Sequence, residues 1–195
     1  MGVKKITLFV NLALIVVGVI FLICGLAQPW HTLKIEDRLG TSTCDITLTE
    51  MKSKSPITSD TTKLKDLCKD DTAYPDKNPF CKLKKGSDTV ISLTTFGLIA
   101  LVVAGVIAVI TLFTQITKKA PAVFKFTYMG TSIAAFVLVL ISFIVYNTSD
   151  DGLKDLESIF GKPFKFGSGW ILYLIAMIIS FATLLLGLSS IVVKD

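Results

Sequence analysis

Hydrophobic residues are concentrated in four long stretches of the chain that contain no charged residue. They cover residues 6–27, about 90–114, about 126–146 and about 167–193, and each is 20 residues or more long. A helix rises about 1.5 Å per residue, so each stretch can cross a hydrocarbon core of about 30 Å. The pattern therefore predicts four transmembrane helices in a single tetraspan domain over residues 1–195, with loops at about 28–89 and 147–166.

The first stretch has a second interpretation as a secretory signal, because Lys4 and Lys5 precede it. The apolar part of a signal peptide is only about 7–15 residues long, and this run is longer. We therefore expect a retained helix that also directs the chain to the membrane.

The first loop has a pattern of its own. Residues 31–36 and 44–49 alternate partly between polar and apolar, and a turn-forming stretch at 38–42 lies between them. This arrangement predicts an antiparallel hairpin with one buried face. A short helix is expected through residues 62–68, with Ser59 or Asp60 as its cap.

Packing between helices in lipid relies on small residues, which allow close approach. The second and third predicted helices contain such residues at Gly97, Ala100, Ala104, Ala108, Gly130 and Ala134. We expect them to pack the helices of one molecule together, and contact between subunits is the alternative. Asn11 is the one strongly polar residue deep in a predicted helix, so we expect it to hydrogen-bond to a neighbouring helix.

Composition supports a membrane protein. Of the 195 residues, 52% are hydrophobic and 18% are charged, against about 25% charged in a typical soluble domain. These values exclude a disordered chain, which needs low hydrophobicity. They also argue against an ordinary soluble globule.

The net charge of +5 reports orientation rather than a nucleic-acid partner. The charges of the two long loops cancel, so the excess comes from Lys4, Lys5, Lys118, Lys119, Lys125 and Lys194, less the one negative charge of Asp195. The positive-inside rule places these lysines, and with them both termini, in the cytoplasm. There they can contact anionic lipid of the inner leaflet.

Three of the four cysteines, Cys44, Cys68 and Cys81, lie in the first loop. An oxidising exterior favours one disulfide among them. Cys68–Cys81 would close a short proline-containing loop, whereas Cys44–Cys68 would join two different elements. The sequence allows both pairings, and we slightly favour Cys44–Cys68 for the second property. The third thiol would then be buried and free, or available to another protein.

The second loop contains a glycosylation sequon at Asn147 and an aromatic cluster. The cluster comprises Phe160, Phe164, Phe166 and Trp170, and Trp30 lies at the exit of the first helix. Aromatic residues at the headgroup level form an interface belt. We favour that interpretation over a patch that contacts a partner.

Residue patterns for catalysis are missing from the sequence. His31 is the only histidine, which is too few for a metal site, and there is no Cys-x-x-Cys pair. Phosphate-binding loops and a nucleophile elbow are absent, and no carboxylate lies in a predicted span. We therefore predict no enzyme, no metal or cofactor, no small-molecule substrate and no nucleic-acid partner.

The layout resembles the claudin and peripheral-myelin-protein superfamily of tetraspan proteins. Pro29-Trp30 at the exit of the first helix matches the family's tryptophan at that place, and residues 44–48 are similar to a segment of the amastin branch. The family's Gly-Leu-Trp-x-x-Cys run is replaced here by Leu-Gly-Thr-Ser-Thr-Cys at residues 39–44. The resemblance implies a membrane all-α four-helix bundle with a small extracellular β-sheet cap, built from the first loop and one strand of the second.

The resemblance also implies a function. It points to a non-enzymatic tetraspan of the plasma membrane that organises the membrane, or mediates adhesion or lateral assembly, through its outer loops. Its partners would be membrane lipid and other membrane proteins or further copies of itself. Two alternatives stay open: an accessory subunit of a larger channel, receptor or membrane complex, and a claudin-like pore former.

Overall fold

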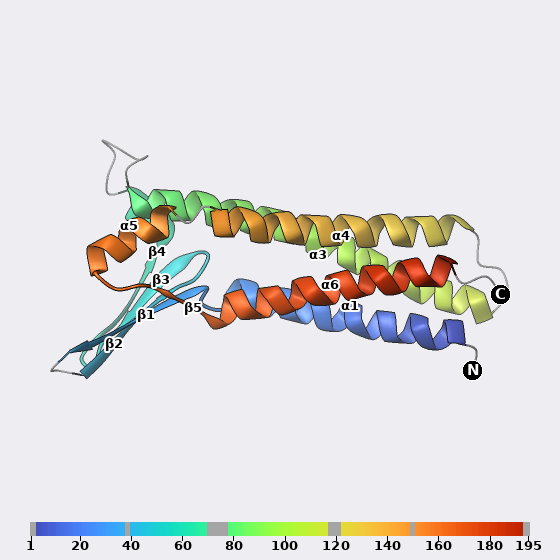
Figure 1. Cartoon of the computed structure of the whole chain (residues 1–195), viewed down its shortest axis with the longest axis horizontal. Helices are drawn as coiled ribbons and strands as arrows, with labels where there is room; N and C mark the ends of the chain where they lie inside the picture. The colour runs from blue at the N-terminus through green and yellow to red at the C-terminus, as the bar shows by residue number, and fades with distance from the viewer. Residues whose placement is uncertain (1–2, 38–39, 70–77, 117–121, 149–150, 193–195) are drawn as a thin grey trace. The chain divides into compact units, whose positions relative to one another are not determined.

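A computed structural model describes residues 3–37, 40–69, 78–116, 122–148 and 151–192. Four helices are long: α1 (Val3–Ala27), α3 (Pro79–Ile116), α4 (Ala122–Thr148) and α6 (Ser168–Val192). Each contains a stretch that is long and apolar enough to cross a membrane. The protein is thus mostly helical, with four candidate membrane spans and a small antiparallel sheet (Figure 1).

The chain divides into two compact units, and each long helix contributes to both. The first unit comprises Met1–Leu22, Leu93–Ile141 and Leu174–Asp195. The second comprises Ile23–Ser92 and Ser142–Tyr173, and it contains all the strands.

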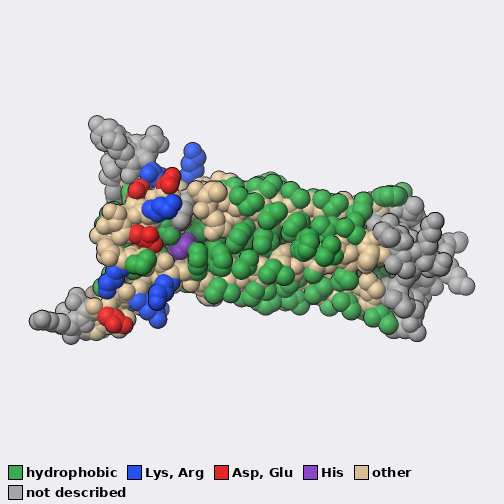
Figure 2. All heavy atoms as spheres, in the orientation of Figure 1, with side chains coloured by type: hydrophobic (Ala, Val, Ile, Leu, Met, Phe, Trp, Pro, Cys, Tyr) green, Lys and Arg blue, Asp and Glu red, His purple; other side chains and the backbone are tan. Residues whose placement is uncertain are grey.

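The first unit buries small side chains and exposes large apolar ones. Ala104, Ala108 and Ala176 are almost completely buried, whereas Ile20 and Phe113 are more than half exposed. Figure 2 shows hydrophobic side chains along the helices and charged ones gathered over the strands. Small residues inside and large apolar residues outside are what a lipid solvent favours.

The close contact between α3 and α4 in this unit depends on Gly97. A Cβ atom at Gly97 would lie 3.1 Å from Cγ2 of Val139. The contact expected through Gly130 and Ala134 does not form among the described residues, because Ala134 is exposed and nothing lies within 4 Å of a Cβ at Gly130. The buried stripe of α4 instead includes Ala135 and Val139, and the other two positions fall off this stripe in the helical period.

Asn11 makes the expected bond between helices. It is 2% exposed, and its side-chain amide donates a hydrogen bond to the hydroxyl of Tyr128 on α4. This bond satisfies the amide nitrogen, which is expensive to leave unpaired inside a membrane span, whereas Oδ1 of Asn11 has no hydrogen-bond partner among the described residues.

The second unit contains a five-stranded antiparallel sheet in the order β4-β3-β2-β1-β5. The strands are β1 (His31–Asp37), β2 (Gly40–Ile46), β3 (Glu50–Lys54), β4 (Ser59–Lys63) and β5 (Lys165–Phe166). β1 and β2 form a hairpin as predicted, with Leu33 opposite Cys44, but the second strand was placed wrongly at residues 44–49. β2 begins at Gly40, within the stretch 38–42 that we expected to turn, because residues 40–42 already pair with β1. The pattern did not predict β3 and β4, because apart from Met51 their residues are all polar.

Two short helices complete this unit. α2 (Leu64–Lys69) begins later than expected because Thr62 and Lys63 still pair with β3. α5 (Asp151–Phe160) occupies a segment that we expected to be loop. Its buried Leu153 and Leu156 are three residues apart, a helical spacing.

One face of the sheet packs against helices. Leu33, Cys44 and Ile46 form a buried cluster with side chains of α3 and α5, namely Leu83, Leu153 and Leu156. α5 and α3 approach so closely that a Cβ at Gly152 would lie 2.7 Å from the carbonyl oxygen of Pro79. Only glycine permits that approach.

The opposite face of the sheet is polar. Lys34 of β1, Thr43 of β2 and Lys54 of β3 pair in one row across it. Because successive side chains of a strand point to opposite faces, the alternation in β1 and β2 gives one apolar and one polar side.

Replacing Gly97 by leucine is expected to destabilise the protein. The new side chain must displace Val139, and overpacking of this kind typically costs about 1–3 kcal/mol. Thermal unfolding of the full chain in mild detergent measures the effect. Gly130→Leu is the matched control, because that site is open and glycine is a poor helix former. Equal loss of stability in both variants would contradict this packing.

Candidate functional site

We call the sheet, α2, α5 and residues 79–92 of α3 the cap. Among the residues that the structure describes, no three His, Cys, Asp or Glu side chains lie close enough together to bind a metal ion. The features that distinguish the cap are instead a buried aromatic junction, a disulfide and one open sheet edge.

The junction is built on Trp30. This side chain is completely buried. Its ring lies 4.3 Å from that of Tyr146 on α4 and 5.1 Å from that of Tyr173 on α6, between centroids. Its indole N–H donates a 2.8 Å hydrogen bond to the carbonyl oxygen of Gly25, in the last turn of α1. The bond satisfies a carbonyl group that the end of the helix leaves without a partner.

The backbone of Trp30 joins two strands that lie far apart in the sequence. Its N–H donates to the carbonyl of Ile46 at 2.8 Å, and its carbonyl accepts from the N–H of Gly167 at 2.7 Å. The N–H of Gly169 donates to the carbonyl of Pro29, also at 2.7 Å. A Cβ at Gly169 would lie 2.6 Å from the carbonyl oxygen of Gln28, so only glycine fits there.

The predicted aromatic residues therefore have different roles. Trp30 is a core residue and does not belong to an interface belt, because it is fully buried. Trp170 is partly exposed, stacks on Phe166 at 4.3 Å and donates its N–H to Oδ1 of Asn147 at 3.3 Å. Phe160 and Phe164 form an edge-on pair with centroids 6.1 Å apart.

Asn147 is exposed at the end of α4. Besides accepting from Trp170, its side chain donates a 2.7 Å hydrogen bond to the carbonyl of Phe143. The amide nitrogen that a glycan would modify therefore already donates to the backbone of Phe143, while the amide oxygen accepts from Trp170. Ser149, the third residue of the sequon, lies outside the described residues.

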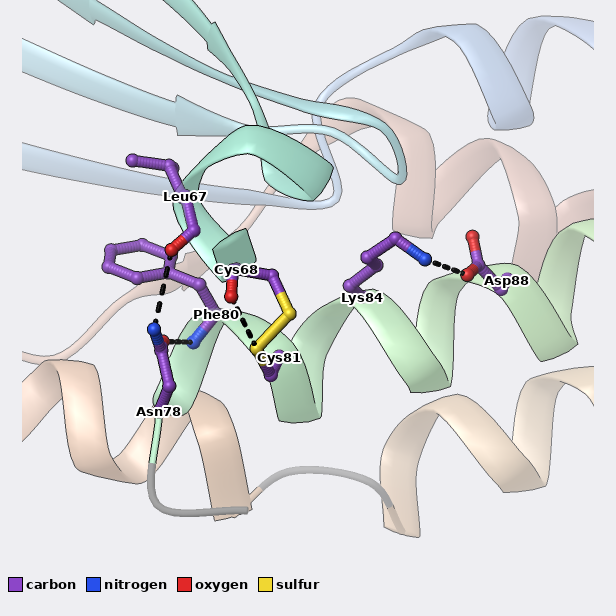
Figure 3. Close-up of a disulfide and its surroundings, with 7 residues drawn as sticks. All are labelled: Leu67, Cys68, Asn78, Phe80, Cys81, Lys84 and Asp88. Atoms are coloured by element: carbon purple, nitrogen blue, oxygen red, sulfur yellow. Dashed lines mark hydrogen bonds and ion pairs between the residues drawn. A yellow bond between two sulfur atoms is a disulfide. The ribbon is translucent and has the colours of Figure 1, made fainter. Parts of the chain in front are cut away.

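The disulfide differs from the pairing that we favoured. Cys68 is joined to Cys81 (Figure 3), and Cys44 is free and buried. Cys44 lies on the inner face of β2, in the core cluster, whereas Cys68 is at the end of α2 beside the first turn of α3. The two cysteines are 13 residues apart in the sequence. A disulfide that closes a loop of this length adds about 3 kcal/mol to the free energy of unfolding in the chain-entropy model.

A helix cap beside the disulfide fixes the start of α3. Oδ1 of Asn78 accepts the N–H of Phe80 at 2.9 Å, and Nδ2 of Asn78 donates to the carbonyl of Leu67 at 3.3 Å (Figure 3). Asparagine before a proline at the first helical position is a common start signal. Sequence reasoning missed it, because it placed this helix start near residue 90.

Some charged residues of the cap form partly exposed ion pairs. Lys82 of α3 bonds to Asp155 of α5 at 2.8 Å, and this hydrogen bond is the main cause of the raised pKa of Lys82. Lys84 pairs with Asp88 one turn further along α3 at 2.5 Å (Figure 3). Exposed pairs of this kind contribute little to stability.

At one edge of the sheet, β4 has only β3 beside it among the residues that the structure describes, so its other side is open there. The turn between these strands is braced by Ser55, whose N–H donates to the carbonyl of Thr58 at 2.8 Å and whose Oγ accepts the N–H of Thr58 at 3.0 Å. At its tip, Ile57 is 82% exposed. This hairpin thus combines unpaired backbone with an exposed apolar side chain.

Peptide mapping without reduction should find Cys68 joined to Cys81. Cys44 should react slowly with a water-soluble maleimide at pH 8, because burial raises the pKa of its thiol to about 11 and little thiolate is present. Denaturant should restore ordinary reactivity. A peptide that links Cys44 to either partner would contradict the arrangement.

Replacing Trp30 by alanine should cost about 3–5 kcal/mol, the usual range for a fully buried aromatic side chain. The loss should appear as faster proteolysis of the cap and a lower melting temperature. Trp170→Ala is the control, since this ring is partly exposed. A larger loss at Trp170 than at Trp30 would contradict the role assigned to the junction.

Comparison with known proteins adds no relatives. No family model matches the chain, and no curated protein matches it. The geometry of the cap and the four apolar helices therefore carries the information on function.

Proposed function

We propose that this protein is a non-enzymatic tetraspan of the plasma membrane whose cap assembles laterally with the cap of a second copy. Four helices that can span a bilayer support an integral membrane protein. The lysines near residues 4, 118 and 194 favour cytoplasmic termini under the positive-inside rule. The cap then lies outside the cell.

Two features support a claudin-like architecture for the cap. β5 comes from the second loop and pairs with β1 of the first, with His31 opposite Phe166. Trp30 lies at the exit of α1, where the superfamily that the sequence resembles has a tryptophan.

The open edge of β4 is the observation that carries the proposal. In an antiparallel pair, residues alternate between those whose backbone groups point to the neighbouring strand and those whose groups point away. The bonds from Leu64 N–H to Thr49 and from Ser55 N–H to Thr58 set this alternation. It directs the backbone groups of Ser59, Thr61 and Lys63 to the open side.

An identical strand fits this edge in one simple register. With Thr61 on a two-fold axis, Ser59 of each copy lies opposite Lys63 of the other, and Asp60 lies opposite Thr62. No like charges face each other, and a threonine pair is favourable across antiparallel strands. A two-fold contact of this kind is self-complementary and closes as a dimer.

A side-chain hydrogen bond partly blocks this edge. Oδ1 of Asp60 accepts the N–H of Thr61 at 2.8 Å. An inserted strand must displace this carboxylate, which is exposed and can therefore move into water at little cost. Charged side chains at an edge moderate pairing and prevent indiscriminate aggregation.

Cysteine crosslinking tests the proposal. Thr61→Cys should form a disulfide-linked dimer in the cell membrane, because the two introduced thiols would meet across the axis. Thr43→Cys is the matched control. It lies on the exposed side of β2, between β1 and β3, so it cannot reach a second copy by edge pairing. The native cysteines stay in both variants.

A dimer band for Thr61→Cys that is at least several times stronger than for Thr43→Cys supports the proposal. Equal bands, or only monomer at native expression levels, would overturn it. Crosslinking of Thr61→Cys to a different protein would favour the accessory-subunit alternative instead.

A further inference from the structure

The chain's single histidine lies at the point where the two loops of the cap meet. His31 is 4% exposed and is the first residue of β1. Its neighbours in the sheet are Ile46 of β2 on one side and Phe166 of β5 on the other. Its imidazole is stacked on the ring of Tyr146, with centroids 5.6 Å apart, and lies 5.8 Å from the ring of Phe166.

This environment suits a neutral imidazole and not a charged one. Nδ1 of His31 has no hydrogen-bond partner among the described residues. A protonated imidazole donates from both nitrogens, and a buried charge without a partner is costly. The proton can be accommodated only if water reaches the ring.

The charged groups around His31 give it little compensation. Glu157 of α5 is the charged group that acts on it and favours the protonated form, but burial outweighs this effect. Oε1 of Glu157 already accepts the N–H of Phe164 at 2.7 Å. Asp45 of β2 and Lys165 of β5 both lie opposite Thr32, on the other face of the sheet. From α4, the phenol ring of Tyr146 faces the imidazole.

β5 is the strand that can separate most easily from the sheet. It has only two residues, paired to His31 and Thr32, and it forms one edge of the sheet. Phe166, which covers the imidazole, is itself 58% exposed. Moving this strand would expose the imidazole to water without breaking the pairing of β1, β2, β3 and β4.

We propose that His31 makes the pairing of β5 with β1 sensitive to acid, so that uptake of a proton by the imidazole releases β5 and the adjoining part of the second loop from the sheet. The proton moves from water to Nδ1, and no covalent bond changes.

The direction of the pH effect on opening, and the pH range in which it occurs, follow from the pKa of His31 in the closed and open forms. Burial lowers the pKa of His31 to about 4 in the closed cap, whereas an exposed imidazole titrates near 6.5. Between these values the open form binds the additional proton, so acid favours opening. The opening equilibrium should rise by up to about tenfold per pH unit below 6.5 and level off below pH 4, after about 300-fold in all. Above pH 7 it should not change.

Hydrogen exchange of the full chain in nanodiscs, read by mass spectrometry at pH 7, 6 and 5, tests the switch. After correction for intrinsic exchange, peptides containing Phe166 and Gly167 should lose protection about sevenfold from pH 6 to 5. Peptides of β2 and β3 should keep theirs. Equal loss in all strands would mean general acid unfolding and would overturn the proposal.

His31→Phe is the decisive variant, since it keeps an aromatic ring against Tyr146 and Phe166 but cannot take up a proton. It should retain β5 protection at all three pH values. Unchanged pH dependence in this variant would overturn the proposal.

A measurement on the unaltered protein decides the matter if that variant fails to fold. Because the chain has one histidine, its imidazole resonance can be assigned without ambiguity in an NMR titration. A midpoint well below 6 that coincides with loss of β5 protection supports the proposal. A midpoint near 6.5 with β5 still protected would overturn it.

Discussion

A helix that leaves a membrane ends with carbonyl groups that no longer have intrahelical partners, and these groups must be satisfied near the boundary. In α1 the side chain of Trp30 meets that need by donating to the carbonyl of Gly25. The same residue is the last one before β1, so its position fixes where the sheet begins. Its backbone then pairs with β2 and with the segment after β5, which ties both loops to one buried side chain.

The rest of the cap follows from this anchor. Once His31 is the first residue of β1, Leu33 is directed to the same face of the sheet, and the hairpin register brings Cys44 and Ile46 to that face as well. An apolar sheet face of this kind needs a cover. α3 provides part of it, because it begins at Pro79 and so extends well before its apolar stretch. α5 provides the remainder through Leu153 and Leu156. The disulfide and the Asn78 cap hold the start of α3 in place for this contact.

The sequence was informative where one physical constraint dominates. A bilayer demands long uncharged helices, so the four apolar stretches were visible directly, and the alternation in β1 and β2 marked a hairpin with one buried face. The sequence was uninformative for segments whose structure depends on contacts with other parts of the chain. β3 and β4 are polar and become strands because β2 offers them an edge. α5 was hidden because Asp151-Gly152 resembles a turn, whereas the glycine is required by the approach of α3.

The cysteines show the same limit. Joining two different elements was a reasonable criterion, and it favoured Cys44, but the decisive fact is which face of β2 a side chain occupies. Cys44 points into the core with Leu33 and Ile46, where it packs as a small hydrophobic residue. Sequence spacing alone cannot distinguish this environment from that of Cys68, because the partner of Cys68 becomes close only when α3 starts at Pro79.

The two edge strands of the sheet differ in how firmly they are held. β4 belongs to a hairpin whose turn is braced by Ser55, and five residue pairs join it to β3. This edge is therefore held firmly by local structure. β5 is held by two pairs and comes from a distant part of the chain, so little local structure resists its release. Because β1, β2 and β3 separate the two edges, the proposed release of β5 would alter the second loop while β4 kept the geometry that the proposed pairing with a second copy requires.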